Sequence, residues 1–285
     1  MIFINPEENR LRAGWRIIIT TVLIISLLIV VSLFVNTHFG IMAALAVIVM
    51  GVLVFSSAVL DKRPYSDYGF HVSAGWFGHF FAGNVMAILA ISLIVIVQIW
   101  FGWIKINSIE LDLLNTSFIT ELGKMFGLML AVSVWEEAYF RGYLISNLKE
   151  GLQIGSINRE WAVLLAVIAS AFVFGIAHAN NPSANLFSVI NISVAGIVLA
   201  YPYIKTGSMA ISVGMHLSWN YFQGTVFGLP VSGVDMEETI ITSTVTGPDL
   251  FTGGLFGPEG GLLGFAGLIV MVVFCYLYLV MFHKK

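Results

Sequence analysis

The sequence predicts an all-α, polytopic integral membrane protein with about eight transmembrane helices, folded as a single domain over residues 1–285. Of its residues, 58% are hydrophobic and only 10% are charged, and the mean hydropathy is +0.93. Soluble domains carry about 25% charged residues, so this chain has too few charges to cover a water-facing surface. The net charge of -3 says nothing about nucleic acid, but the sequence has no basic patch or stripe, so we expect no nucleic-acid partner. Cys275 is the single cysteine, which excludes an intrachain disulfide.

Eight apolar runs account for the predicted helices, because a helix needs about 20 residues to cross a bilayer. The first run follows three arginines and is longer than the apolar region of a signal peptide, so we expect it to be retained as a helix. The other seven are each separated by polar or glycine-containing segments. In order, the runs are residues 15–35, 41–60, 80–101, 118–140, 161–178, 184–204, 208–227 and 262–282.

The distribution of basic residues tests this layout independently. If the N-terminus is cytoplasmic and eight helices alternate, the outside collects only Lys105 and Lys124. The cytoplasmic segments collect most of the 13 Lys and Arg residues, namely Arg10, Arg12, Arg16, Lys62, Arg63, Lys149, Arg159, Lys205, Lys284 and Lys285. This bias predicts a multi-pass protein of the cell membrane with both termini in the cytoplasm.

The segments between the runs carry less information. Residues 62–75 and 147–160 have the composition of ordinary cytoplasmic connectors. The longest outside segment, 228–261, is rich in Gly, Thr and Ser, and its glycines permit tight turns. A connection of this length is usually either functional or mobile.

Three ionisable side chains come together near the end of the fourth run, directly after the uncharged residues 126–134. A charge at membrane depth costs at least about 2.5 kcal/mol, so it normally faces a partner or a wet cavity. Glu137 and Arg141 are four residues apart and share a helical face, whereas Glu136 points elsewhere. This spacing indicates an ion pair beside a free carboxylate that is suited to act as a general base. The alternative is an ion pair at the membrane interface, with Glu136 solvated.

Two histidines at the edges of later runs complete the candidate site. His178 follows Phe174 by one turn, and His216 and Asn220 share one face of the seventh predicted helix. Two hydrogen-bonding groups on one face can hold a carbonyl oxygen as negative charge develops on it. The alternatives are capping or packing for the first histidine and interhelical hydrogen bonds for the other pair. The remaining histidines fall in loops or at the ends of the predicted helices, away from these motifs; they are His38, His71, His79 and His283.

The motifs Glu-Glu-x-x-x-Arg at 136–141, Phe-x-x-x-His at 174–178 and His-x-x-x-Asn at 216–220 occur in that order on three predicted helices. In this order they resemble the CAAX-protease and bacteriocin-processing (CPBP) family of intramembrane glutamic or metallo-endopeptidases. The similarity covers a motif-bearing core of residues 121–223. It implies hydrolysis of a peptide bond in a membrane-associated or prenylated-type protein.

The resemblance also implies a role for each matching residue. Glu136 would activate the attacking water, and His178 would help to hold that water. His216 and Asn220 would line the oxyanion site. The residues that would support and tune Glu136 are Glu137 and Arg141.

The sequence leaves metal dependence open. Relatives are often called metalloproteases, and Glu136, His178 and His216 could supply three ligands to a divalent metal such as zinc. The chain lacks His-Glu-x-x-His, the spacing that places two zinc ligands on one helical face. We therefore do not require a metal, and we expect a membrane-associated protein or peptide and the lipid bilayer as partners.

Two other functions fit the same residues. In a proton- or ion-coupled transporter the carboxylates and histidines would form an ion pathway, although neither inverted repeats nor paired broken helices are visible in the sequence. In a non-catalytic membrane immunity or sequestration protein the same groups would only bind a partner peptide.

The shared site imposes a condition on the fifth predicted helix. His178 lies about 26 Å along that helix from Trp161, which would carry it toward the outer face, away from Glu136. We therefore expect residues 161–165 to protrude toward the cytoplasm.

Overall fold

The computed structural model describes residues 3–5, 8–112, 114–153 and 157–282, without the side chain of His38. His283, Lys284 and Lys285 lie outside the described residues. Seven helical segments in this part of the chain are long and apolar enough to cross a membrane, which confirms the all-α, polytopic class. Six of them are α1 (Ala13–Ser32), α2 (His38–Val59), α3 (Ala74–Trp100), α6 (Arg159–Ala177), α7 (Leu186–Thr206) and α10 (Leu262–Phe282).

The predicted helix at 208–227 is shorter than expected. α8 (Ala210–Tyr221) has 12 residues and continues as a five-residue π-helix, η3 (Phe222–Val226). Every residue from Ala210 to Asn220 is buried, because α8 packs against α3, α4 and α7. A helix enclosed by other helices does not have to match the thickness of the hydrocarbon layer, which explains its length.

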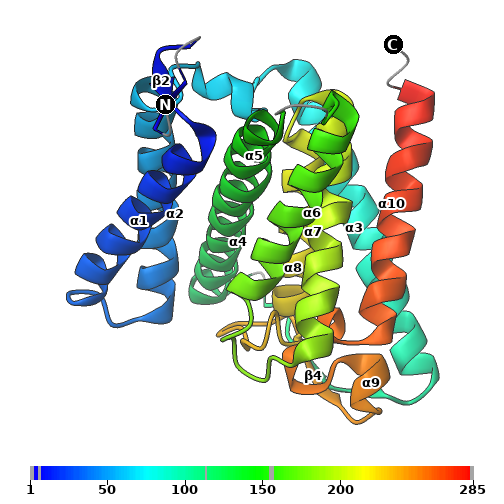
Figure 1. Cartoon of the computed structure of the whole chain (residues 1–285). Coiled ribbons are helices and arrows are strands. Elements are labelled where there is room, and N and C mark those ends of the chain that lie inside the picture. The colour runs from blue at the N-terminus through cyan, green and yellow to red at the C-terminus, as the bar shows by residue number, and fades with distance from the viewer. Residues whose placement is uncertain (1–2, 6–7, 113, 154–156, 283–285) are drawn as a thin grey trace.

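The helices run alternately up and down the molecule, so α1 begins and α10 ends at the same end of the bundle (Figure 1). That end also holds the short strands β1 (Ile4–Asn5) and β2 (Arg10–Leu11) and the short helix η1 (Tyr65–Tyr68) (Figure 1). α8 lies between these helices, but in the described part of the chain seven segments, not the eight predicted, are long and apolar enough to span a membrane. The protein is therefore a multi-pass membrane protein, and the cytoplasmic location of this end remains a prediction from the basic residues.

The fourth segment corrects one prediction. We expected the helix to end near residue 140 and a connector to occupy 147–160, but the helix continues to Leu152. It consists of α4 (Thr116–Glu136), the π-helix η2 (Glu137–Leu144) and α5 (Ile145–Leu152). Its 37 residues extend about 55 Å, well beyond a hydrocarbon core of about 30 Å. Packing stabilises the extension, because Ile145 joins a buried cluster with Ala166 of α6 and Ala200 of α7.

This extension explains how Glu136 of α4 and His178 at the end of α6 come to lie at similar heights in the bundle. From Leu152 to Glu136 the helix runs about 24 Å, and from Arg159 to His178 about 28 Å. Because α5 and α6 pack side by side, Glu136 and His178 reach similar heights in the bundle. The protrusion of residues 161–165 from the membrane stays a prediction.

The outside segment 228–261 is folded, which the sequence did not predict. β4 (Ile241–Val245) pairs antiparallel with β3 (Ile104–Ile109), at the end of the bundle opposite β1 and β2 (Figure 1). The short helices α9 (Asp249–Thr252), η4 (Gly254–Phe256) and η5 (Pro258–Gly260) then lead into α10.

The main apolar core lies between α3, α7, α8 and α10. α3 and α8 approach each other closely at two glycines. A Cβ atom on Gly214 would lie 2.2 Å from the carbonyl oxygen of Phe80, and one on Gly83 would lie 2.3 Å from that of Ile211. Glycine is therefore required at both positions, and the contact fixes the helix that carries His216.

Candidate active site

The two adjacent glutamates lie where the helix geometry changes. Glu136 is the last residue of α4 and Glu137 is the first residue of the π-helix η2. Such π turns occur frequently at functional sites, because they break the regular i→i+4 bonding pattern. The side chains are buried, with 7% of Glu136 and 0% of Glu137 exposed. Buried carboxylates need partners, so their contacts identify what the site can do.

One carboxylate oxygen of Glu137, Oε1, contacts both Arg141 and His216. Its Oε1 lies 3.2 Å from Nη1 of Arg141, which is the ion pair that the spacing predicts. The same oxygen lies 2.8 Å from Nδ1 of His216, a contact that the sequence did not predict. The guanidinium of Arg141 also lies over the ring of Phe174, 4.1 Å from its centroid. Glu137 therefore connects α8 to the arginine on its own helix.

Glu136 is the less occupied of the two carboxylates. Its Oε2 lies 3.6 Å from Nε2 of His216 and has no hydrogen-bond partner among the described residues. A polar separation of this size is commonly bridged by water. The geometry thus agrees with the expected division between a paired Glu137 and a free Glu136.

His178 caps the end of α6 and has a defined tautomer. Its Nδ1 lies 2.8 Å from the carbonyl oxygen of Phe174, and its ring packs edge-on against the same residue. A carbonyl oxygen only accepts hydrogen bonds, so Nδ1 carries the hydrogen. In the neutral imidazole, Nε2 is then available as an acceptor.

A cavity of about 290 Å³ brings the four candidate catalytic residues together, because its wall includes Glu136, His178, His216 and Asn220. Apolar side chains such as Met42 of α2 and Leu128 of α4 form much of the remaining wall. The fully buried Glu137 and Arg141 support this wall from behind, through the bond to His216. All six residues singled out from the sequence therefore belong to one region of the structure.

The structure adds a residue that the sequence reasoning missed. Glu259, in η5, lines the same cavity and is only 8% exposed. Its Oε2 accepts from Nε1 of Trp219 at 3.1 Å, and its Oε1 accepts from the hydroxyl of Ser232 at 2.5 Å and from the backbone N–H of that serine. Burial raises the pKa of Glu259, and these hydrogen bonds offset only part of that effect.

Further hydrogen bonds fasten the outside segment to the cavity. Asn181, three residues after His178, donates to the carbonyl of Ser232 at 3.1 Å, and Asn191 donates to the carbonyl of Glu259 at 3.0 Å. The segment 228–261 is thus a wall of the site. The sequence contains one sign that this segment could contribute to the site, namely the carboxylate of Glu259 within Phe-Gly-Pro-Glu-Gly-Gly, directly before the last apolar run.

The donor set does not fit a metal ion as the residues are arranged. Glu136, His178 and His216 line one cavity, yet in the described part of the chain no three His, Cys, Asp or Glu side chains form a group that could hold a metal. We therefore derive no step through a metal.

Comparison with known families identifies the segment that carries this site. Residues 118–222 match the family described as type II CAAX prenyl endopeptidase Rce1-like. This segment is an Rce1-like domain. It contains all three motifs, so the CPBP family that they predict is confirmed for this part of the chain. The Rce1-like domain spans α4 to α8, whereas Glu259 and the segment 228–261 lie outside it.

One curated relative also matches. A Bacillus subtilis (strain 168) protein called "Uncharacterized protein YyaK" is 32% identical over 90 residues, which is 30% of this chain and 27% of that protein. The similarity thus spans about a quarter of the relative's length. No solved structure matches this chain.

Proposed function

We propose that the protein is an intramembrane endopeptidase that hydrolyses a peptide bond by means of a water molecule activated by Glu136. The observation that carries this proposal is the shared cavity: four residues with the required chemistry, from three helices of an Rce1-like domain, line the same cavity. The membrane is proposed to be the cell membrane, with the shared end of α1 and α10 on the cytoplasmic side.

The proposed reaction begins with a water molecule near Oε2 of Glu136. Glu136 removes one proton from it, while Nε2 of His178 accepts a hydrogen bond from the same water. The resulting hydroxide attacks the peptide carbonyl carbon. The protonated Glu136 then passes its proton to the departing amine, so that the carboxylate is restored when the C–N bond breaks.

The oxyanion that forms during attack needs hydrogen-bond donors. Asn220 supplies an amide N–H. Nδ1–H of His216 donates to Glu137, so a hydrogen on Nε2 as well requires the imidazolium form, and this form supplies Nε2–H to the oxyanion. Glu137 orients the histidine, and Arg141 balances the charge of Glu137. This division assigns a chemical task to each of the six residues.

The proposed substrate is a membrane-associated protein, of the prenylated type that the family's description names. The apolar part of the wall, including Met42, Leu128 and Met129, supports apolar groups on the substrate next to the scissile bond.

A comparison of membrane proteomes tests the proposal. Cells with wild-type protein are compared with cells carrying Glu136→Gln or His216→Ala, and new peptide termini are mapped by mass spectrometry. Glu121→Gln is the matched control, because it removes a carboxylate from the same helix at a partly exposed site paired with Lys124. We expect fragments that are lost in both site variants and kept in the control.

Purified protein and the identified substrate peptide then give the rate directly. Identical fragments in all four strains, with the variants folded and inserted, would refute proteolysis. If a cellular phenotype is nevertheless lost in the site variants, ion transport through the same cavity becomes the better explanation.

A further inference from the structure

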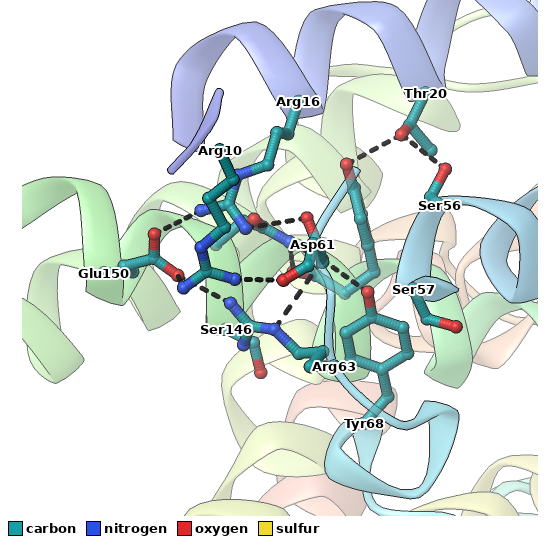
Figure 2. Close-up of polar contacts among 12 residues, drawn as sticks. Arg10, Arg16, Thr20, Ser56, Ser57, Asp61, Arg63, Tyr68, Ser146 and Glu150 are labelled. Atoms are coloured by element: carbon teal, nitrogen blue, oxygen red, sulfur yellow. Dashed lines mark hydrogen bonds and ion pairs between the residues drawn. The ribbon is translucent and has the colours of Figure 1, made fainter. Parts of the chain in front are cut away.

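A second polar region lies at the end of the bundle where α1 begins and α5 ends (Figure 1), and Figure 2 shows its polar contacts. Asp61, directly after α2, is fully buried and pairs with Arg16, whose Nη1 lies 2.8 Å from Oδ1. Glu150 of α5 is bound by three arginines, Arg10, Arg16 and Arg63. These five residues, the arginine cluster, join α1, α2 and α5. Its two carboxylates are thus already compensated.

A pocket of about 440 Å³ opens beside the arginine cluster. Of the three carboxylates in its wall, Glu150 belongs to the cluster, Glu8 pairs with Arg10 at 2.6 Å, and Asp67 is exposed to solvent. The cations in its wall are Arg10, Lys62, Arg63 and Lys149.

Several N–H groups of this pocket have no hydrogen-bond acceptor among the described residues. Lys149 forms no hydrogen bond or ion pair with the residues that the structure describes; the charges of Arg159 and Arg63 repel it, and that of Glu150 attracts it. The Nε atom of Arg63 is buried and has no hydrogen-bond partner there, although it lies 3.9 Å from Oδ2 of Asp61. Lys62 donates to the carbonyl of Asn9 at 2.6 Å, which leaves two of its three N–H groups without an acceptor in the described part of the chain. The pocket therefore has surplus donors and surplus positive charge close together.

The backbone also indicates that Lys62 is held in place. Its φ is +49°, in the left-handed region that residues with a side chain rarely adopt. Such a conformation persists only where the surrounding structure enforces it, and it is found preferentially at ligand sites. Here it turns the chain directly after Asp61 and lets the Lys62 side chain reach the turn at Asn9. Lys62 is therefore part of a built pocket.

We propose that this pocket binds a phosphate group, carried by the headgroup of an anionic phospholipid. Phosphate oxygens act only as acceptors, which matches donors that lack one. Basic pockets between helix ends on the cytoplasmic side recognise such headgroups, and the basic residues of this chain predict that this end faces the cytoplasmic leaflet. The bound headgroup connects the end of α2 to α5, which continues the helix that carries Glu136.

The test measures lipid retention by full-length protein, purified in detergent and analysed by native mass spectrometry. Phosphatidylglycerol and phosphatidylcholine are compared for the wild type and for Lys62→Gln/Lys149→Gln. The matched control is Lys105→Gln/Lys124→Gln, which removes two lysines at the opposite end of the bundle. Inorganic phosphate is added in a further arm to distinguish a free anion from a headgroup.

We expect the wild type to retain phosphatidylglycerol in preference to phosphatidylcholine, and the pocket variant to retain it about 30-fold less, because two lysines are removed. The control variant should behave as wild type. Equal retention by the pocket and control variants, or no preference in the wild type, would overturn the proposal. Displacement of the lipid by millimolar phosphate would overturn the lipid source and leave a site for free phosphate. If the double variant does not fold, Lys149→Gln alone gives the same comparison.

Discussion

The ion pair between Glu137 and Arg141 offers a quantitative test of how the site is supported. Both side chains are buried, with 0% and 1% exposed. Removing one member of a buried pair leaves an uncompensated charge and typically costs about 3–5 kcal/mol. We expect that loss in the free energy of unfolding for Glu137→Gln, which still accepts a hydrogen bond from His216, and a similar loss for Arg141→Met.

The double variant separates this mechanism from a simple loss of contacts. When both charges are absent, no uncompensated charge remains in the apolar interior, and replacing a whole buried pair is often nearly neutral. The double variant should therefore be no less stable than either single variant, instead of losing about 6–10 kcal/mol as additive effects would predict.

Unfolding in mixed micelles, followed by far-ultraviolet circular dichroism, measures these free energies. The exposed pair Glu121 and Lys124 on the same helix is the matched control, because surface pairs contribute only about 0–1 kcal/mol. Strictly additive losses for Glu137 and Arg141 would refute the reasoning. Restored stability without restored activity is expected in the double variant, since His216 then lacks its carboxylate partner.

Two further predictions concern the packing of α8 and the outside wall. Gly214→Ala should cost about 1–3 kcal/mol of unfolding free energy through overpacking against Phe80. Gly127 has open space around it, so Gly127→Ala should be neutral or stabilising in the same assay. Equal effects of the two substitutions would contradict the close contact at Gly214. Glu259 has a raised pKa in the fold, so its contribution to stability is present at low pH and is lost as pH rises above the ordinary value of 4.5. The unfolding temperature of the wild type should therefore fall with rising pH more steeply than that of Glu259→Gln, and parallel curves would contradict this.

The sequence located the six site residues, but their contacts depended on the fold. The Glu137–Arg141 pair was predictable because both residues lie on one helix, four positions apart. The bond from His216 to Glu137 was not, because it joins residues 79 positions apart. The end of the fourth helix was predicted too early, because the polar composition after residue 146 resembles a connector, while packing of Ile145 against α6 and α7 keeps the chain helical.

The wall built by the outside segment was missed for a related reason. Its glycines and short polar runs carry no period that predicts helix or strand, and β3 and β4 are far apart in the chain. Glu259 enters the cavity through hydrogen bonds with Trp219 and Ser232, 40 and 27 positions away. No local pattern encodes such pairings.

The sequence alone thus determined the membrane class and the residues able to take part in chemistry, because hydropathy and helical spacing are local properties of the chain. The tertiary structure decided which of these residues share a cavity, that His216 and Arg141 both contact Oε1 of Glu137, and that Glu259 lines the same cavity. It also revealed the arginine cluster and its pocket. These features arise where separate helices pack together, and packing depends on shapes and charges that meet only in the folded molecule.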